Sequence, residues 1–190
     1  MCKKCKKPGD SVWRPHFFCD SVFTIPYDFL YAKGIRGLIF DIDNTLAGYD
    51  DPTPPERILD LYADLQTRGF KVGLLSNNND ERLRVFNQAT GLPGYARACK
   101  PAAFALTRLL RDLALPRRET ALVGDQLFTD VWCARRAGLC SVLVKPLTDK
   151  DVWLVRAKRR LEQRVLRRWT AGHTIEQKTL TPGTCGFLRD

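Results

Sequence analysis

The alternation of short apolar runs with helical stretches between residues 35 and 145 constrains the fold more than any other feature of this sequence. The runs are bounded by glycine, proline or acidic residues, which is typical of buried strands. The expected strands are 37–40, 71–75, 121–123 and 141–144, and the expected helices are 54–68, 80–90, 101–113 and a segment that ends at Ala137. Strands separated by helices of this length predict right-handed βαβ units. We therefore expect an α/β fold: a three-layer, Rossmann-like parallel sheet with helices on both faces.

The length of the chain suits one sizeable hydrophobic core. The chain has 190 residues, of which 44% are hydrophobic, and a chain of this length seldom builds two separate cores. We expect the core, with an aromatic lead-in, over residues 13–147. A basic N-terminal extension (1–12) precedes it, and a basic amphipathic helix (148–170) and a tail (171–190) follow it.

The net charge of +10 is concentrated at the two ends of the chain. Residues 1–7 contain four Lys and no acid, and residues 150–190 contain ten Lys and Arg against four acids. The stretch between them holds 17 basic and 17 acidic side chains and is neutral. A localised basic segment indicates an anionic partner surface, either acidic lipid or nucleic acid.

The expected C-terminal helix combines an apolar side with a row of arginines. Its apolar positions are Leu154, Val155, Leu161, Val165, Leu166 and Trp169, and its arginines at helical spacing are Arg156, Arg160, Arg164 and Arg167. Such a helix can lie on an anionic membrane. It can equally pack its apolar side on the sheet and leave its arginines in water, and both contacts are compatible.

The cysteines favour a reducing compartment. There are seven, an odd number without a framework spacing, so we expect reduced thiols in a cytoplasmic protein. Cys2 and Cys5, with His16 and Cys19, offer zinc ligands, but their spacing matches no closed four-ligand pattern. A basic terminus that carries two thiols is the alternative that we favour.

Polar side chains follow three of the expected strands at their carboxyl ends. Asp41 and Asp43 come after the first strand, Ser76 and Asn77 after the second, and Asp125 and Asp130 after the third. In open α/β sheets the binding crevice lies outside these ends. Carboxylates crowded there repel one another unless a divalent cation neutralises them, and hard oxygen ligands favour Mg²⁺.

Four motifs in this order resemble those of the haloacid-dehalogenase-like (HAD) phosphatases. They are Asp41-Ile42-Asp43-Asn44-Thr45, Ser76-Asn77-Asn78, Lys100-Pro101 and Gly124-Asp125-Gln126-Leu127-Phe128-Thr129-Asp130. The resemblance implies an Mg²⁺-dependent phosphomonoesterase in which Asp41 attacks phosphorus and forms an aspartyl-phosphate. It implies that Asp43 is the general acid and base and that its backbone carbonyl binds the metal.

The same resemblance gives roles to the remaining motif residues. Ser76 and Asn77 would hold the phosphoryl group and its loop, and Lys100 would neutralise the charge of the transferring group. Asp125 would complete the Mg²⁺ site, and Asp130 would be a further ligand or would orient one. Thr45 and Thr129 are either supporting donors or cap residues.

The spacing of the motifs leaves no room for an inserted cap domain, so we expect an open site that suits a phosphate on a bulky substrate. The lead-in 15–22, the 34–37 approach and the 124–131 motif are similar to the capless YqeG-type group, which is related to phosphatidylglycerophosphate phosphatases. This similarity implies hydrolysis of phosphatidylglycerophosphate to phosphatidylglycerol. It implies an anionic phospholipid head group as the substrate and a peripheral location on the inner face of the membrane, with contact through the basic C-terminal helix.

Two other functions are compatible with parts of the sequence. A soluble phosphatase that acts on a nucleic-acid end or a small phosphate ester would have the same open site and basic ends. A binding or scaffold protein on a retired phosphatase fold is the other possibility, but the acids, the serine and the lysine of the motifs are all intact.

Overall fold

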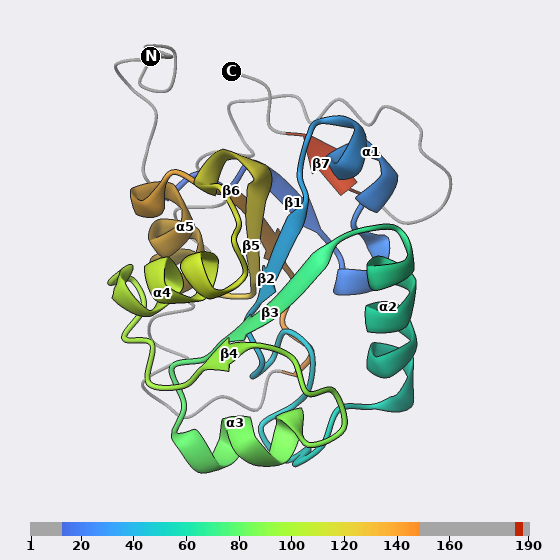
Figure 1. Cartoon of the computed structure of the whole chain (residues 1–190), viewed down its shortest axis with the longest axis vertical. Helices are drawn as coiled ribbons and strands as arrows, with labels where there is room; N and C mark the ends of the chain where they lie inside the picture. Colours follow the sequence, from blue (N-terminus) through green and yellow to red (C-terminus); the bar gives the residue numbers. More distant parts are fainter. Residues whose placement is uncertain (1–12, 149–184, 188–190) are drawn as a thin grey trace.

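The computed structural model describes residues 13–148 and 185–187, and its centre is a seven-stranded sheet (Figure 1). The order of the strands across the sheet is β4-β3-β2-β5-β6-β1-β7. The strands are β1 (Phe17–Cys19), β2 (Gly37–Phe40), β3 (Lys71–Leu75), β4 (Gly94–Tyr95), β5 (Thr120–Gly124), β6 (Cys140–Val144) and β7 (Cys185–Phe187). All neighbouring pairs are parallel except β1 and β7, which are antiparallel.

Helices cover both faces of this sheet, as expected from the alternating pattern (Figure 1). The helices are α1 (Tyr27–Ala32), α2 (Glu56–Thr67), α3 (Asp80–Asn87), α4 (Phe104–Asp112) and α5 (Trp132–Ala137), with 3₁₀ turns at Val22–Thr24 and Arg117–Glu119 and a π-helical turn at Leu127–Val131. The α/β, three-layer architecture predicted from the sequence is confirmed.

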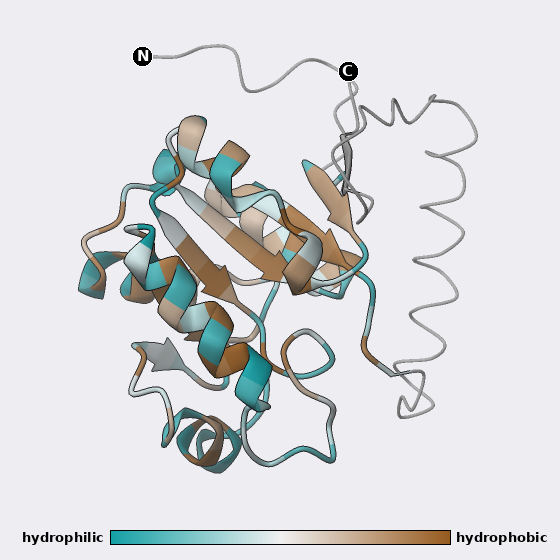
Figure 2. Ribbon diagram, turned by 90° about the vertical axis from the view of Figure 1, so that its right-hand side faces the viewer, coloured by the Kyte–Doolittle hydropathy of each residue, from teal (hydrophilic) through white to brown (hydrophobic). Residues whose placement is uncertain are grey.

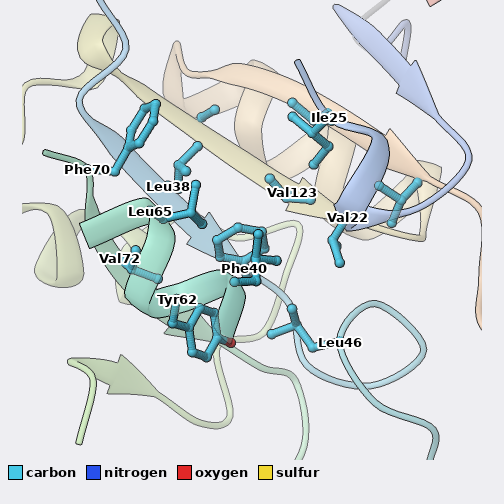
Figure 3. Close-up of a cluster of buried hydrophobic side chains, with 14 of the residues drawn as sticks. Val22, Ile25, Leu38, Phe40, Leu46, Tyr62, Leu65, Phe70, Val72 and Val123 are labelled. Carbon is cyan, nitrogen blue, oxygen red and sulfur yellow. The ribbon is translucent and has the colours of Figure 1, made fainter. Parts of the chain in front are cut away.

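Two hydrophobic clusters fill the spaces between the layers. Strands β2 and β5 are buried along their whole length, which explains why they read as continuous apolar runs rather than alternating ones (Figure 2). Leu38 and Phe40 of β2 face the cluster beneath α1 and α2 (Figure 3), and Ile39 between them faces the cluster beneath α4 and α5. Successive strand residues point to opposite faces, so one short strand serves both clusters.

Some boundaries differ from the predicted ones for local reasons. Helix α4 begins at Phe104 rather than at residue 101. Cys99 has a left-handed φ of 53°, and the segment between it and Phe104 is not helical. The predicted helix 80–90 ends at Asn87, whose side chain binds the backbone of Leu92 and turns the chain. The short strand β4 was not predicted, because two residues carry no periodic signal.

The lead-in holds more regular structure than the sequence indicated. Strand β1 pairs with β6, so that the aromatic run around Phe17 forms an edge of the main sheet. Strand β7 then pairs with β1 from within the predicted tail. The extension 1–12 and the predicted basic helix lie outside the described residues. Among the residues that are described, none of the helices is both long and apolar enough to cross a bilayer.

Candidate active site

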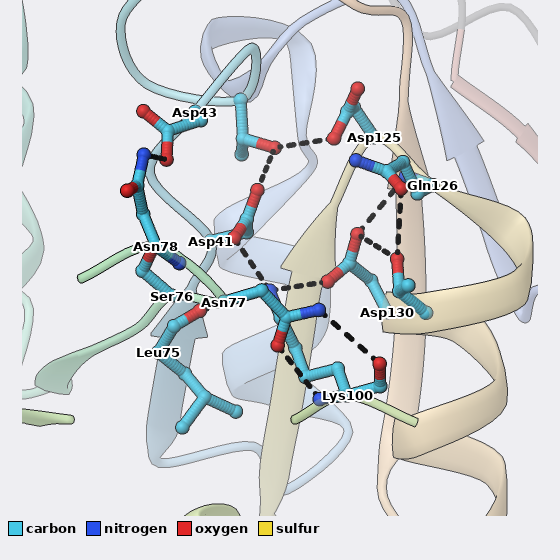
Figure 4. Close-up of polar contacts among 12 residues, drawn as sticks. Asp41, Asp43, Leu75, Ser76, Asn77, Asn78, Lys100, Asp125, Gln126 and Asp130 are labelled. Atoms are coloured by element: carbon cyan, nitrogen blue, oxygen red, sulfur yellow. Dashed lines mark hydrogen bonds and ion pairs between the residues drawn. The ribbon is translucent and has the colours of Figure 1, made fainter. Parts of the chain in front are cut away.

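A pocket at the carboxyl edge of the sheet gathers the polar residues that follow β2, β3 and β5 (Figure 4). Asp41, Ser76 and Asp125 come directly after these three strands. Because the strands are parallel neighbours, these residues lie at one edge. The pocket has a volume of about 260 Å³ and is lined by Asp41, Asp43, Tyr49, Asn77, Asn78, Lys100, Gln126 and Thr129.

The turn after β2 brings both of its aspartates to the pocket. Asn44 occupies the left-handed region with φ 63°, a conformation that Asn tolerates better than most residues. Its backbone N–H donates to the Ala47 carbonyl at 2.7 Å, and its side-chain oxygen accepts two hydrogen bonds from Thr148, at 3.0 and 3.2 Å. The chain after β6 therefore fixes the turn that carries Asp41 and Asp43.

The ammonium group of Lys100 lies between two carboxylates. Lys100 Nζ donates to Asp41 Oδ1 at 2.5 Å and to the Leu75 carbonyl at 2.9 Å. It also forms an ion pair with Asp130 Oδ1 at 2.6 Å. The Lys100 and Asp130 side chains are each only 2% exposed. Water therefore screens these charges little.

Burial controls the ionisation of this group. Loss of solvation raises the pKa of Asp41 from 3.8 to about 7, against the lowering effect of Lys100 and with a further increase from Asp130. Burial alone would lower the pKa of Lys100, but the charges of Asp130 and Asp41 outweigh it and raise that pKa. Lys100 is therefore a permanent cation, whereas Asp41 is ionised only at a cost.

Three buried carboxylates at this edge of the sheet, one of which lines the pocket, could hold a metal ion together. One oxygen each from Asp41, Asp125 and Asp130 lie within 4.8 Å of one another. When ionised, these three acids and the Lys100 ammonium together leave two negative charges. The charge and the hard oxygen donors both fit a divalent cation. Thr45 adds a weak contact, because its Oγ1 lies 3.4 Å from Asp41 Oδ2 and 3.5 Å from Asp125 Oδ1.

The π-helical turn after β5 orients Asp130. Asp130 Oδ2 accepts hydrogen bonds from Gln126 N at 3.1 Å and from Thr129 Oγ1 at 3.3 Å. Gly124 is required beside it, because a Cβ there would lie 2.5 Å from Asp130 Cβ. The turn Leu127–Val131 departs from regular α-helical spacing at this functional position. Asp130 is thus held toward Lys100 by its own loop.

Each residue of the run Ser76–Asn77–Asn78–Asn79 makes a different contact. Ser76 Oγ accepts from Asn78 N at 3.0 Å, which leaves its hydroxyl proton for another acceptor. The Asn77 side chain binds both backbone groups of Lys100, accepting from N at 2.7 Å and donating to O at 3.2 Å. Asn79 caps helix α3 by accepting from Arg82 N at 2.8 Å.

Asp43 has both carboxylate oxygens occupied. Arg82 Nε donates to its Oδ1 at 2.9 Å, and Asn78 Nδ2 donates to its Oδ2 at 3.1 Å. The other Arg82 nitrogens donate to the carbonyls of Asp51 at 2.6 Å, Pro52 at 2.9 Å and Gly48 at 3.2 Å. One guanidinium therefore joins Asp43 to the loop that carries Tyr49.

The predicted site residues come together at this edge of the sheet, but in three groups. Asp41, Lys100, Asp125 and Asp130 form one charged cluster; Ser76 and Asn77 order the loop beside it. The Asp43 carboxylate lies outside the acidic cluster and pairs with Arg82. The predicted metal contact of Asp43 is through its backbone carbonyl and stays a prediction.

Sequence reasoning missed Arg82 and Tyr49, and it named Asn78 and Gln126 within motifs but gave them no role. Arg82 sits three residues after Asn79 in the first turn of a helix that starts at the pocket. That position was the available signal, since N-terminal helix residues of parallel α/β folds lie near the carboxyl ends of the strands.

Comparisons with known proteins agree with this geometry. The family model described as HAD-hydrolase-like matches residues 97–162. The protein named probable phosphatase YqeG, of Bacillus subtilis (strain 168), is 34% identical over 152 residues, which cover 80% of this chain and 88% of that protein. The chain belongs to the YqeG-type family of HAD-like phosphatases.

Two further comparisons place this HAD-like phosphatase among other proteins. The chloroplastic/mitochondrial phosphatidylglycerophosphate phosphatase 1 of Arabidopsis thaliana is 29% identical over 165 residues, 82% of this chain and 47% of that protein. The chain thus spans about half of that relative. A HAD family enzyme variant from Bacteroides thetaiotaomicron, crystallised with magnesium and inorganic phosphate, has 15% identity and a TM-score of 0.50 over 62% of this chain and 98% of its own. That likeness concerns the fold alone.

Proposed function

We propose that this phosphatase is Mg²⁺-dependent and hydrolyses phosphatidylglycerophosphate to phosphatidylglycerol at a membrane surface, through an aspartyl-phosphate on Asp41. One observation carries the chemical part: the buried Lys100 ammonium bridges Asp41 and Asp130, beside Asp125. This arrangement supplies a carboxylate nucleophile, a fixed cation for the phosphoryl oxygens and oxygen ligands for a metal.

In the first step an Asp41 carboxylate oxygen forms a bond to phosphorus, and the bond between phosphorus and the ester oxygen breaks. Asp43 gives its proton to the departing alkoxide, which leaves as an alcohol. Lys100 and the Ser76 hydroxyl bind phosphoryl oxygens, where charge accumulates in the transition state. Asn77 keeps Lys100 in place through its two backbone hydrogen bonds.

In the second step a water molecule attacks phosphorus and the bond to Asp41 breaks. Asp43, now ionised, takes the proton of the water, and inorganic phosphate leaves. A bound Mg²⁺, held by Asp41, Asp125 and Asp130, would neutralise negative charge on these groups and on the phosphate. The net charge of the cluster is the reason to expect such an ion.

The substrate assignment is supported by the size of the pocket and by the relatives. A pocket of about 260 Å³ suits a phosphate-bearing head group but not two acyl chains, which would stay in the bilayer. The stretch of chain between Asp43 and Ser76 contains the 48–52 loop, α2 and β3, and no inserted domain. The Arabidopsis relative is named for this activity.

Phosphate release by the purified protein tests the proposal. The substrates are phosphatidylglycerophosphate in mixed micelles, a 5′-phosphorylated oligonucleotide and simple sugar phosphates, each with Mg²⁺ and with a chelator. We expect preference for the lipid and loss of activity in the chelator. A preference for the oligonucleotide or the sugar phosphates would replace the lipid substrate with those of a soluble phosphatase. Turnover that does not depend on Mg²⁺ would overturn the proposed Mg²⁺ dependence.

A further inference from the structure

Four exposed apolar side chains belong to segments at the carboxyl edge of the sheet. Among the described residues, the exposed large hydrophobic side chains are Phe23 (42%), Tyr31 (37%), Tyr49 (37%), Phe104 (84%) and Leu147 (37%). Four of them lie where the chain leaves the carboxyl end of a parallel strand: Phe23 in the turn after β1, Tyr49 in the loop after β2, Phe104 at the first residue of α4 after β4, and Leu147 after β6. This is the edge at which the pocket opens. We call these four residues the rim. Tyr31 lies near the end of α1, where the chain returns to the start of β2.

The rim flanks the pocket from both faces of the sheet. Phe23 belongs to the turn Val22–Thr24, whose Val22 packs into the cluster beneath α2. Phe104 begins α4, which packs on the opposite face. Tyr49 lines the pocket between them. An exposed Phe at 84% has no stabilising role in the fold, since its ring stays in water.

Two sources of positive charge lie at or continue from this edge. Arg57 lies over the Phe23 ring, with its guanidinium 5.2 Å from the ring centroid. The chain also leaves the described core here, because Thr148 is bonded to Asn44 beside the pocket. The sequence that follows, 150–190, carries ten Lys and Arg against four acids. Aromatic side chains next to cationic ones are the composition that binds the headgroup region of acidic membranes.

We propose that the rim is the surface by which the protein docks on an anionic lipid bilayer, with Phe23 and Phe104 inserted on either side of the pocket. This inference rests on the proposed function, because docking in this orientation faces Asp41 toward the head groups. The acyl chains of the substrate then never leave the membrane. Only the phosphate has to rise into the pocket.

Vesicle binding tests the rim without any turnover. The double variant Phe23→Ser/Phe104→Ser is sedimented with vesicles of phosphatidylglycerol and phosphatidylcholine, beside wild type and Tyr31→Ser, a control at the opposite edge. We expect the rim variant to bind about tenfold less and the control to bind as wild type does. All three should hydrolyse p-nitrophenyl phosphate at the same rate, which reports an intact site.

The outcomes separate the rim from the proposed function. Equal vesicle binding by wild type and the double variant overturns the rim as the docking surface, whatever the lipid activity. Wild type that binds vesicles but does not hydrolyse phosphatidylglycerophosphate overturns the substrate and leaves the rim standing. If the double variant does not fold, the single Phe104→Ser variant decides, because the Phe104 side chain is almost fully in water.

A different observation carries a second proposal, about Arg82. Its three nitrogens bind Asp43 and the carbonyls of the Gly48–Pro52 loop. The guanidinium carbon of Arg82 lies 5.4 Å from the centroid of the Phe86 ring, and the Phe86 side chain is fully buried. We propose that Arg82 is a positioning residue that fixes the Asp43 carboxylate for proton transfer to the leaving group. A carboxylate oxygen has a second lone pair, so these contacts leave Asp43 able to carry a proton.

The dependence on the leaving group tests this role. p-Nitrophenolate departs without a proton, whereas an alkoxide requires one. In Arg82→Gln we expect kcat/KM to fall about tenfold or more for sn-glycerol 3-phosphate and for the lipid, and about threefold or less for p-nitrophenyl phosphate. Arg82→Lys should recover part of the loss, and Arg84→Gln, which alters an exposed ion pair on the same helix, should change neither rate.

A double variant distinguishes positioning from general damage. In an Asp43→Asn background, Arg82→Gln should add no further loss on the alkyl esters, because Arg82 acts through Asp43. The Asp43→Asn substitution also removes the buried Asp43 charge, which is left unpaired in the single variant Arg82→Gln and could unfold it. Equal losses on both leaving groups, or additive losses in the double variant, would overturn the positioning role. Wild-type hydrolysis of the esters tests the phosphatase activity separately.

Discussion

The pocket contains two ion-pair systems that differ in their balance of charge. In the first, Asp41 and Asp130 share the ammonium of Lys100 and Asp125 lies beside them, in side chains that are almost fully buried. In the second, Asp43 faces the guanidinium of Arg82, and each side chain is 11% exposed. The first system lacks positive charge, whereas the second has one cation for one anion.

The difference shows which of the two systems is suited to bind a cation and which one fixes the geometry of the site. A buried cluster with excess negative charge is unfavourable by itself and gains stability from a cation that binds it. A balanced pair whose guanidinium already donates four hydrogen bonds gains nothing from a further ion. It holds its carboxylate and its loop in one geometry instead.

Removal of the proposed nucleophile has the largest effect. Asp41→Asn should lower phosphate release about 10⁴-fold or more, since the amide cannot attack phosphorus. The variant should stay folded, because the substitution removes one of the repelling carboxylates. Phosphate release and circular dichroism measure the two expectations. Turnover at the wild-type rate would exclude Asp41 as the nucleophile.

Loss of Lys100 should reduce both activity and stability. Lys100→Met leaves Asp41 and Asp130 without their shared cation, so kcat should fall about 10²–10³-fold and the free energy of unfolding by about 3 kcal/mol. Added Mg²⁺ should raise the melting temperature more in this variant than in wild type. Arg82→Gln should lack that extra response, and an equal response in both variants would contradict the contrast between the two systems.

The effect of Mg²⁺ on stability should grow with pH. The pKa of Asp41 in the folded, metal-free protein is about 7, above its ordinary 3.8. Its contribution to stability is therefore complete below 3.8 and is lost as the pH rises through about 7. Mg²⁺ should offset this loss, so that the rise in melting temperature on adding it is about 4 °C larger near pH 8 than near pH 5.

This pH series has an internal control. Asp41→Asn lacks the titrating group, so the response of its melting temperature to Mg²⁺ should vary less with pH. A Mg²⁺ response in wild type that is the same at both pH values would show that proton release from Asp41 is not coupled to binding.

The smallest effect is expected at Asn78. Asn78→Ala removes the hydrogen bond to Asp43 Oδ2 and the one that Asn78 Oδ1 accepts from Asn79 N at 2.8 Å, but leaves the Arg82 contact. The free energy of unfolding should fall by about 1 kcal/mol, and activity on alkyl phosphates should fall a few-fold. Urea unfolding and steady-state kinetics measure both. A loss as large as that of Arg82→Gln would mean that the amide, not the guanidinium, fixes Asp43.

The strands and most site residues could be predicted because their signals are local. The buried runs of β2, β3, β5 and β6 are dense in apolar residues, and each acidic motif directly follows a run. Parallel pairing then forces Asp41, Ser76 and Asp125 to one edge. Lys100 depended on the resemblance, since a lysine beside a proline carries no spatial signal of its own.

The features that sequence reasoning missed depend on long-range contacts. Arg82 reaches Asp43, 39 residues away in the chain, and an arginine in the first turn of a helix usually indicates only a solvated surface. The π-helical turn that aims Asp130 is specified by packing against Gly124 rather than by a pattern. Strand β1 has three residues, too few for a period-two signal.

The place of β1 has a consequence for the order in which the fold can be completed during synthesis. β1 is made first, yet it pairs with β6, and His16 binds Ser141 across 125 residues of chain. Until β6 has left the ribosome, both edges of this aromatic strand are unpaired. Unpaired strand edges make an incomplete chain prone to aggregate. The pairing of β1 with β7 then closes its second edge. The slow step in assembling this sheet should therefore be the docking of its earliest strand, and chaperone dependence should concentrate there.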